Sequence, residues 1–175
     1  MLAEIKHSLL ITKSTIPNSG NGVFTNTKIN KESQITTYRG KRKTKLEFEQ
    51  LLKNQNKEAL HYSVTIPNSS DVIIGNIHTK DLRSCGQFIN DSACVLDKTF
   101  NYQQGLEYVN SVTKTNCYLS HYGDEIHIIA SRDIESGEEL YLHYGYSYWT
   151  YGMEISPSNI AQYFTLLEKD KTVFG

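Results

Sequence analysis

The chain has 175 residues, the length of one ordinary domain, and at this size a single core can close without disulfide or metal staples. Its 18 Lys and Arg against 19 Asp and Glu give a formal net charge of -1, which argues against a general nucleic-acid coat, because such a coat needs an excess of cations. The mean hydropathy is -0.47 and the longest aliphatic runs span three residues, so no membrane-spanning helix is expected.

Cysteine and histidine usage gives no sign of a disulfide framework or a metal site. The 3 cysteines are odd in number and never form a Cys-x-x-Cys pair. The 6 histidines show no ligand spacing with cysteine or carboxylates, so we expect them to be ordinary polar positions and predict no bound metal. The amino terminus lacks a long apolar stretch, which predicts no secretion signal. The cysteine usage predicts a reducing compartment, cytoplasm or nucleus.

Short runs typical of β-strands recur along the chain between turn residues such as Pro, Asn, Ser and Gly. In chain order, the predicted strands are 9–12, 22–24, 34–38, 62–66, 72–74, 106–109, 117–122, 126–130 and 140–143. This spacing predicts a mostly β domain with minor α content.

Two helices interrupt this pattern. The first is predicted over about residues 44–60, because Thr44 and Glu47 form a Thr-x-x-Glu capping box in front of an apolar stripe. The second follows Pro157 and Ser158, after which apolar residues recur at helical spacing. The basic run 41–45 is interpreted as a solvated loop, with a weak nuclear-import or acidic-partner patch as the alternative.

Tyrosine is the most over-represented residue. There are 12 in the chain, and five of them lie with one tryptophan in the eleven residues 141–151. Two interpretations stay open. Tyrosine suits the half-buried surface of a sheet, so the rings can be ordinary β packing. A cluster this dense also suits an aromatic pocket with polar tips, because each buried hydroxyl needs a partner.

Three segments read together carry the functional signal, namely the Gly-Asn-Gly-Val-Phe of 20–24, the Gly-Gln-Phe-Ile-Asn-Asp-Ser of 86–92 and the turn, strand and Tyr-Gly-Tyr of 137–146. In this order they resemble the SET domain of protein-lysine methyltransferases. Further matching motifs are Tyr38–Gly40 as the Tyr-x-Gly step, Asn116–Cys117 as the Asn-Cys pair, and the block 128–140 that runs into Tyr144 and Gly145.

The resemblance implies a fold of small curved sheets around a C-terminal pseudoknot. It assigns residues 1–150 to the SET domain, with the first helix in its inserted middle region and an insertion at about 93–115 that is either a small hairpin near the substrate or an inert surface loop. Residues 151–175 form a tail with a helix that closes the cofactor and lysine sites, since no cysteines follow for a zinc-bound lid.

The resemblance also implies an activity, the transfer of a methyl group from S-adenosylmethionine to the ε-amine of a protein lysine, leaving S-adenosylhomocysteine. Cofactor and lysine enter opposite faces and meet in a narrow channel that aligns them. Burial beside a sulfonium lowers the pKa of the lysine amine, and tyrosine rings stabilise the methylammonium product. Neither a metal nor a direct nucleic-acid or membrane partner is implied.

Individual roles follow from the motifs. The catalytic residues implied by the resemblance are Tyr144, its channel partner Tyr38, and Tyr146. The implied cofactor-binding residues are Gly20, Asn21, Gly22, Asn90, Asp91, Tyr144 and Trp149, the last by stacking on adenine or else as core packing. The implied substrate channel consists of Tyr38, Leu142, Tyr146 and Leu119. The pair Glu138 and Glu139 is expected to order a turn rather than to act as bases.

Two departures from the family pattern matter. Asp91 stands where the family has histidine, which alters any side-chain contact there and adds an acid near a cation. Leu142 stands where the family tends to carry Phe or Tyr, and an aliphatic residue at this position favours di- or trimethylation. A histone tail is the default substrate. A catalytically silent SET-like module that binds a peptide or recruits a partner is the alternative, and an unrelated β-sandwich with coincidental motifs is a third.

Overall fold

The computed structural model describes residues 8–17, 19–66, 69–92 and 114–145, together with Gln103, Tyr148, Gln162, Thr165 and Glu168. The chain divides into two compact units. Unit 1 consists of Met1–Asn90 and Asn116–Leu140, and unit 2 consists of Asp91–Thr115 and Tyr141–Gly175. The boundary at residue 150 that the sequence suggests remains a prediction.

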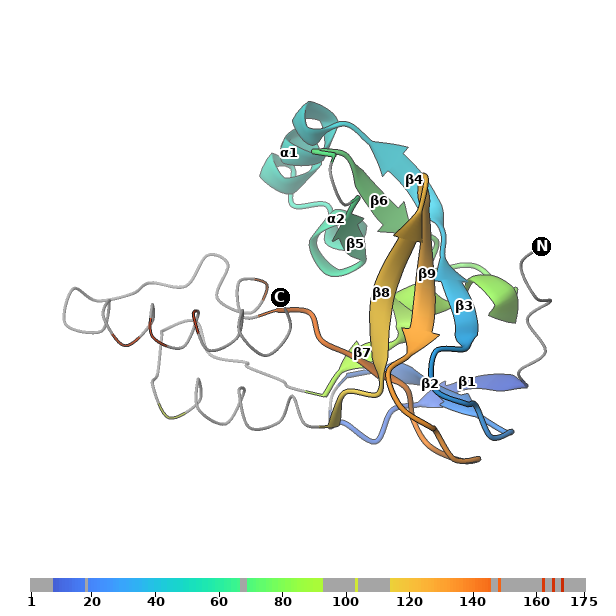
Figure 1. Cartoon of the computed structure of the whole chain (residues 1–175). Coiled ribbons are helices and arrows are strands. Elements are labelled where there is room, and N and C mark those ends of the chain that lie inside the picture. The colour runs from blue at the N-terminus through green and yellow to red at the C-terminus, as the bar shows by residue number, and fades with distance from the viewer. Residues whose placement is uncertain are drawn as a thin grey trace. The chain divides into compact units, whose positions relative to one another are not determined.

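Unit 1 is built from three small sheets (Figure 1). Its strands are β1 (Leu9–Lys13), β2 (Asn21–Thr25), β3 (Gln34–Tyr38), β4 (Gly40–Lys43), β5 (Ser63–Thr65), β6 (Val72–Gly75), β8 (Cys117–Tyr122) and β9 (Glu125–Ala130). β1 pairs with β2, β9 lies between β3 and β8, and β6 lies between β4 and β5. All of these pairs are antiparallel. The prediction of a mostly β fold is therefore confirmed.

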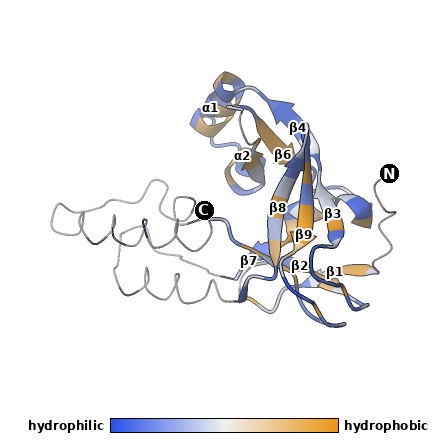
Figure 2. Cartoon of the chain, viewed as in Figure 1, coloured by the Kyte–Doolittle hydropathy of each residue, from blue (hydrophilic) through white to orange (hydrophobic). Residues whose placement is uncertain are grey.

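The core of unit 1 is aliphatic. Figure 2 shows hydrophobic residues along β6 and β9. The largest side chains that are fully buried include Val23, Ile29, Ile35, Ile89, Ile126, Ile128, Ile134 and Leu140. Ile126 and Ile128 are two residues apart in the central strand β9, so they point to the same face of its sheet, and both are buried. Burying branched side chains from several strands is what stabilises sheets this small.

The predicted helix over 44–60 is two helices, α1 (Lys45–Lys53) and α2 (Lys57–His61). The predicted capping box is present, with the Thr44 hydroxyl accepting from Glu47 N and the Glu47 carboxylate accepting from Thr44 N. The helix breaks at Gln55, whose φ of 53° is left-handed, and Asn56 then caps α2. Because Asn56 caps a second helix within the predicted apolar pattern, the structure has two helices where the sequence predicts one.

The interpretation of the basic run 41–45 as a loop is wrong for most of its length. Residues 41–43 belong to β4, whose Lys41 pairs with Ile74 of β6. Charged residues are accepted there because β4 is an edge strand, where lysine and arginine suit exposure. The ion pair of Arg42 with Asp71 at 2.8 Å also joins β4 to the residue that directly precedes β6.

Two 3-10 turns, η1 (Leu82–Ser84) and η2 (Gly86–Phe88), lead into β7 (Asn90–Asp91). β7 pairs with β10 (Tyr141–Leu142), which the sequence predicted as a longer strand over 140–143. The predicted strand at 106–109 lies outside the described residues. Of the predicted C-terminal helix, Gln162, Thr165 and Glu168 are described, and all three are helical.

Candidate active site

The glycine-rich segment at the start of β2 packs against a buried acid. Glu139 is only 5% exposed, and a Cβ on Gly22 would lie 2.9 Å from its Cδ and closer still to its Oε1. Glycine is therefore required at position 22, because the Glu139 carboxylate lies too close to the backbone there to leave room for a side chain. Gly20 differs, because its φ of 71° favours glycine for conformation, while a Cβ there would meet no described atom within 4 Å.

Glu139 ties this segment to the preceding turn. Its carboxylate accepts hydrogen bonds from Ser14 Oγ at 2.6 Å, from Thr15 N at 2.8 Å and from Thr15 Oγ1 at 2.6 Å. Charge-assisted bonds of this kind are short and strong. The expectation that Glu139 only orders its own turn was therefore too local, because its carboxylate holds Ser14 and Thr15, which lie more than a hundred positions away in sequence. No signal in Ser14 or Thr15 pointed to this contact.

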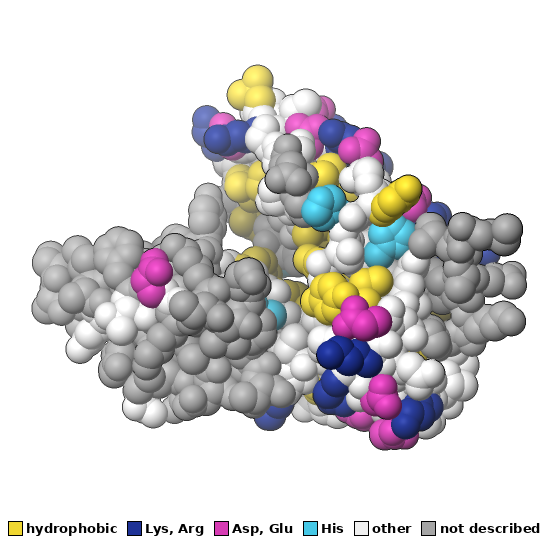
Figure 3. All heavy atoms as spheres, in the orientation of Figure 1, with side chains coloured by type: hydrophobic (Ala, Val, Ile, Leu, Met, Phe, Trp, Pro, Cys, Tyr) yellow, Lys and Arg dark blue, Asp and Glu magenta, His cyan; other side chains and the backbone are white. Residues whose placement is uncertain are grey.

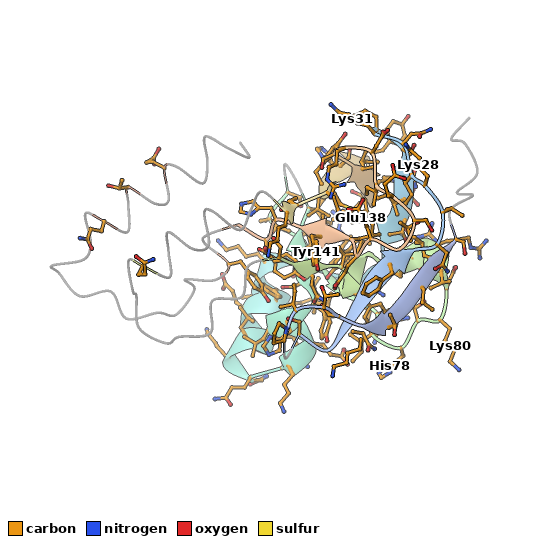
Figure 4. The ribbon with its side chains drawn as sticks, turned by 90° about the horizontal axis from the view of Figure 1, so that it is seen from below. Lys28, Lys31, His78, Lys80, Glu138 and Tyr141 are labelled. Atoms are coloured by element: carbon orange, nitrogen blue, oxygen red, sulfur yellow. The ribbon has the colours of Figure 1, made fainter. Side chains whose placement is uncertain are left out.

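Glu138 does order its own turn. Its carboxylate accepts from Glu135 N at 2.6 Å and pairs with Arg132 at 2.7 Å. The Arg132 guanidinium holds the pKa of Glu138 below its ordinary value. Figure 4 labels Glu138, and also Lys28, which pairs with Glu135 at 3.0 Å.

Two asparagines of the family motifs connect segments that are distant in sequence. Asn90 donates through Nδ2 to the Asn21 carbonyl at 2.9 Å. Asn116, only 1% exposed, donates through Nδ2 to the Glu139 carbonyl at 2.9 Å. Unit 1 thus brings together four positions from the motifs, including two of the predicted cofactor-binding residues, Asn21 and Asn90.

Tyr38 ends β3 with an 8% exposed side chain. A Cβ on Gly75 would lie 3.1 Å from the Tyr38 hydroxyl and 2.6 Å from Gln87 Cβ, so both side chains crowd the same side of β6. Gln87 donates through Nε2 to the Asn76 carbonyl, and its buried Oε1 has no hydrogen-bond partner among the residues that the structure describes. Gln87 is a polar neighbour of Tyr38 that the sequence reasoning missed.

A cavity of about 710 Å³ borders the Tyr-x-Gly step in unit 1. Arg39 and Gly40 line it together with residues of β6, the segment after β6, and the two helices. This is a hollow of the size that ligand sites have. Leu119, a predicted channel residue, lies on the edge strand β8 with 41% of its surface exposed.

In unit 2, Asp91 and Tyr144 are in direct contact. Asp91 is 4% exposed, and its Oδ2 accepts a hydrogen bond from Tyr144 N at 2.9 Å. The Tyr144 ring meets the Tyr148 ring edge to face, with centroids 4.9 Å apart. Leu142 is 3% exposed in β10. The other predicted site residues of this unit, Tyr146 and Trp149, lie outside the described residues.

The face of unit 1 drawn in Figure 3 carries acidic and basic side chains next to each other. In the described part of the chain, no helix is long and apolar enough to cross a membrane. Within the same part, no three His, Cys, Asp or Glu side chains gather as a metal site would require.

Comparison with known proteins identifies the class. The family model described as the SET domain matches residues 20–145, and the chain belongs to this family. A search of curated proteins found no match. The resemblance drawn from the motifs is therefore confirmed, and so is the SET fold.

Solved structures agree on the fold. One is PRC2 in an autoinhibited conformation bound to S-adenosylmethionine (ctPRC2), at 17% identity and a TM-score of 0.53. Two others are humanized mutants of the Chaetomium thermophilum Polycomb Repressive Complex 2 bound to inhibitors, at 16% and 18% identity with TM-scores of 0.53 and 0.52. Each match covers 79% of this chain but 15% of the other, so the chain spans about a seventh of their length.

Proposed function

We propose that this protein transfers methyl groups from S-adenosylmethionine to the ε-amine of a lysine in a protein substrate. The observation that carries the proposal is the SET family match over 20–145, which spans the glycine motif, Asn90 and Tyr144. The S-adenosylmethionine in a PRC2 structure of the same fold supports this choice of cofactor.

The residues of unit 1 suit such a cofactor. Among the described residues, no atom lies within 4 Å of where a Cβ on Gly20 would be, so this part of the structure leaves the backbone there accessible. Asn90 is already fixed to Asn21 by a hydrogen bond of 2.9 Å, so the polar groups of this segment are pre-organised. We propose that Gly20, Asn21, Gly22 and Asn90 bind the cofactor, with backbone from Asp91 and, outside the described residues, the ring of Trp149.

When bound, S-adenosylmethionine supplies a methyl group on a sulfonium that an amine can attack. The site must present the lysine nitrogen in its neutral form. In water the side chain is protonated at neutral pH, because its reference pKa is about 10.4. Burial of the amine against apolar and aromatic side chains disfavours the ammonium form and so lowers the pKa of the lysine. Tyr38, 8% exposed, and Leu142, 3% exposed, are suited to supply such side chains. The phenol of Tyr144 orients the nitrogen lone pair, and Tyr146 lines the channel.

The substrate is a protein, and a histone tail is the first candidate because it is the default for this family. The cavity beside Arg39 and Gly40 is the proposed entry for the substrate segment. The side chains of Cys85 and Cys117 are buried, which suits the proposed reducing compartment, cytoplasm or nucleus.

A labelled-methyl assay on histones and a cell-lysate panel tests the proposal. We expect incorporation into protein, reduced about 100-fold or more in Tyr144→Phe, the scale expected when a reacting group loses its positioning. Tyr118→Phe is the matched control, because its hydroxyl donates to Glu32 at 2.7 Å on the exposed surface. Cofactor binding without turnover on any substrate would contradict the enzyme and favour a silent peptide-binding module.

A further inference from the structure

Asp91 is the residue at which this chain departs most clearly from the family motif, and its carboxylate is engaged. It lies 4% exposed in β7, with Oδ2 at 2.9 Å from Tyr144 N. The two residues are 53 positions apart in sequence, so the bond joins the Asn-Asp-Ser motif to the Tyr-Gly motif within unit 2.

The backbone around Tyr144 explains why an acceptor is needed at this point. The strand β10 ends at Leu142, so ladder pairing stops before Tyr144. Gly145 follows with a φ of 91°, a left-handed turn that takes the chain out of the strand direction. A partly buried backbone N–H beyond the end of a ladder requires another acceptor, and the Asp91 carboxylate provides it.

A carboxylate suits this task because an ionised Asp only accepts hydrogen bonds, and a bond from N–H to a charged acceptor is stronger than one between neutral groups. Fixing the backbone N–H of Tyr144 fixes the Cα from which its ring extends. The ring itself is held on one side by the edge-to-face contact with Tyr148 at 4.9 Å. Together the two contacts leave little freedom in where the phenol points.

We propose that Asp91 is a positioning residue for Tyr144, and that its side chain acts on the tyrosine backbone rather than on the cofactor. This inference rests on the proposed function in one respect, that Tyr144 is the catalytic tyrosine. It differs from a direct role of the Asp91 side chain toward the cofactor. A positioning role needs an acceptor oxygen, whereas a role toward a sulfonium needs the negative charge.

Substitutions separate these two roles. Asp91→Asn keeps an acceptor oxygen in the same place and removes the charge, whereas Asp91→Ala removes both. Asp133→Ala is the matched control, because its carboxylate also accepts from a backbone N–H, that of Lys31 at 2.9 Å, but on the exposed surface. The purified full chain is used for every measurement.

Three quantities are measured: hydrogen exchange at the Tyr144 amide by NMR, kcat for methyl transfer, and the Kd of S-adenosylmethionine by calorimetry. In Asp91→Ala we expect exchange at Tyr144 to be at least about 10-fold faster and kcat to fall about 10- to 100-fold, while Kd changes less than about 3-fold. Asp91→Asn restores slow exchange and brings kcat to within about 3-fold of the wild type. Asp133→Ala leaves all three unchanged.

The inference is overturned if Asp91→Asn weakens cofactor binding as much as Asp91→Ala does, or if exchange at Tyr144 is the same in all variants. If Asp91→Ala does not fold, Asp91→Asn alone decides. A large loss of kcat or of cofactor affinity in Asp91→Asn would refute the positioning role, because that role needs the acceptor oxygen and not the charge. If the wild type transfers no methyl but Asp91→Ala still releases the Tyr144 amide, the proposed function fails while the contact that fixes Tyr144 stands.

Discussion

Replacing Gly22 by alanine tests the packing that holds the glycine motif. The new Cβ would lie 2.9 Å from Glu139 Cδ and closer to Oε1, the atom that accepts from Ser14 Oγ. Glu139 cannot yield easily, because it is buried and its other oxygen accepts two hydrogen bonds from Thr15. The φ of Gly22 is not left-handed, so the clash is the reason for any effect.

The magnitude follows from two contributions. Overpacking a tight site costs about 1–3 kcal/mol. Displacing Oε1 also breaks at least one hydrogen bond to a charged group, worth about 1.5–3 kcal/mol. We therefore expect Gly22→Ala to lower the free energy of unfolding by about 2.5–6 kcal/mol, a large share of the roughly 5–15 kcal/mol that typical proteins have.

Urea unfolding of a double-mutant cycle with Glu139→Ala measures this directly. Without the carboxylate, the nearest atom to the new Cβ is Ser14 Cβ at 3.3 Å, a contact that a small shift relieves. Gly22→Ala should then cost less than about 1 kcal/mol, so the two substitutions are strongly non-additive.

The control is Gly20→Ala, where a Cβ would meet no atom of the described residues within 4 Å but φ is 71°. It should cost about 1–2 kcal/mol in either background, because only backbone conformation is affected. Equal costs of Gly22→Ala with and without Glu139 would refute the packing argument.

Three further predictions concern strand pairing, pH and product. Gly40→Ala should lower the free energy of unfolding by more than about 3 kcal/mol in urea, because its Cβ would collide with the Ile74 carbonyl, and an unchanged midpoint would contradict this. The Glu47 carboxyl, held by Thr44, has its pKa lowered from 4.5 to about 2. Its contribution to stability is therefore fully present above about pH 4.5 and fades as the pH falls toward 2, and a carboxyl NMR titration with a midpoint near 4.5 would count against it. Leu142→Tyr should shift the product toward monomethyl lysine in mass spectra, whereas an unchanged di- or trimethyl pattern argues against its role in the channel.

Local signals in the sequence were sufficient where the partner is nearby. The capping box of Thr44 and Glu47 was predicted and is present. Short strands were predicted because their apolar runs are bounded by turn residues, and most lie within a residue or two of their expected ends. The family motifs identified the fold, because several of them occur in a fixed order.

Contacts between distant segments could not be predicted in this way. The basic strand β4 has no apolar alternation, and it exists because β6 pairs with it. The helix break at Gln55 depends on a left-handed residue that composition does not reveal. Glu139 and Asp91 lie within motifs, yet their partners Thr15 and Tyr144 are 124 and 53 residues away, so their roles emerged only from the fold.

The central claim is tested most directly by a crystal structure with S-adenosylhomocysteine and a lysine-containing substrate peptide. The account predicts the cofactor product against Gly20–Gly22 and Asn90, and the lysine nitrogen entering from the opposite face within hydrogen-bond distance of the Tyr144 hydroxyl. A cofactor bound elsewhere, or a phenol of Tyr144 with no passage to the lysine, would contradict it.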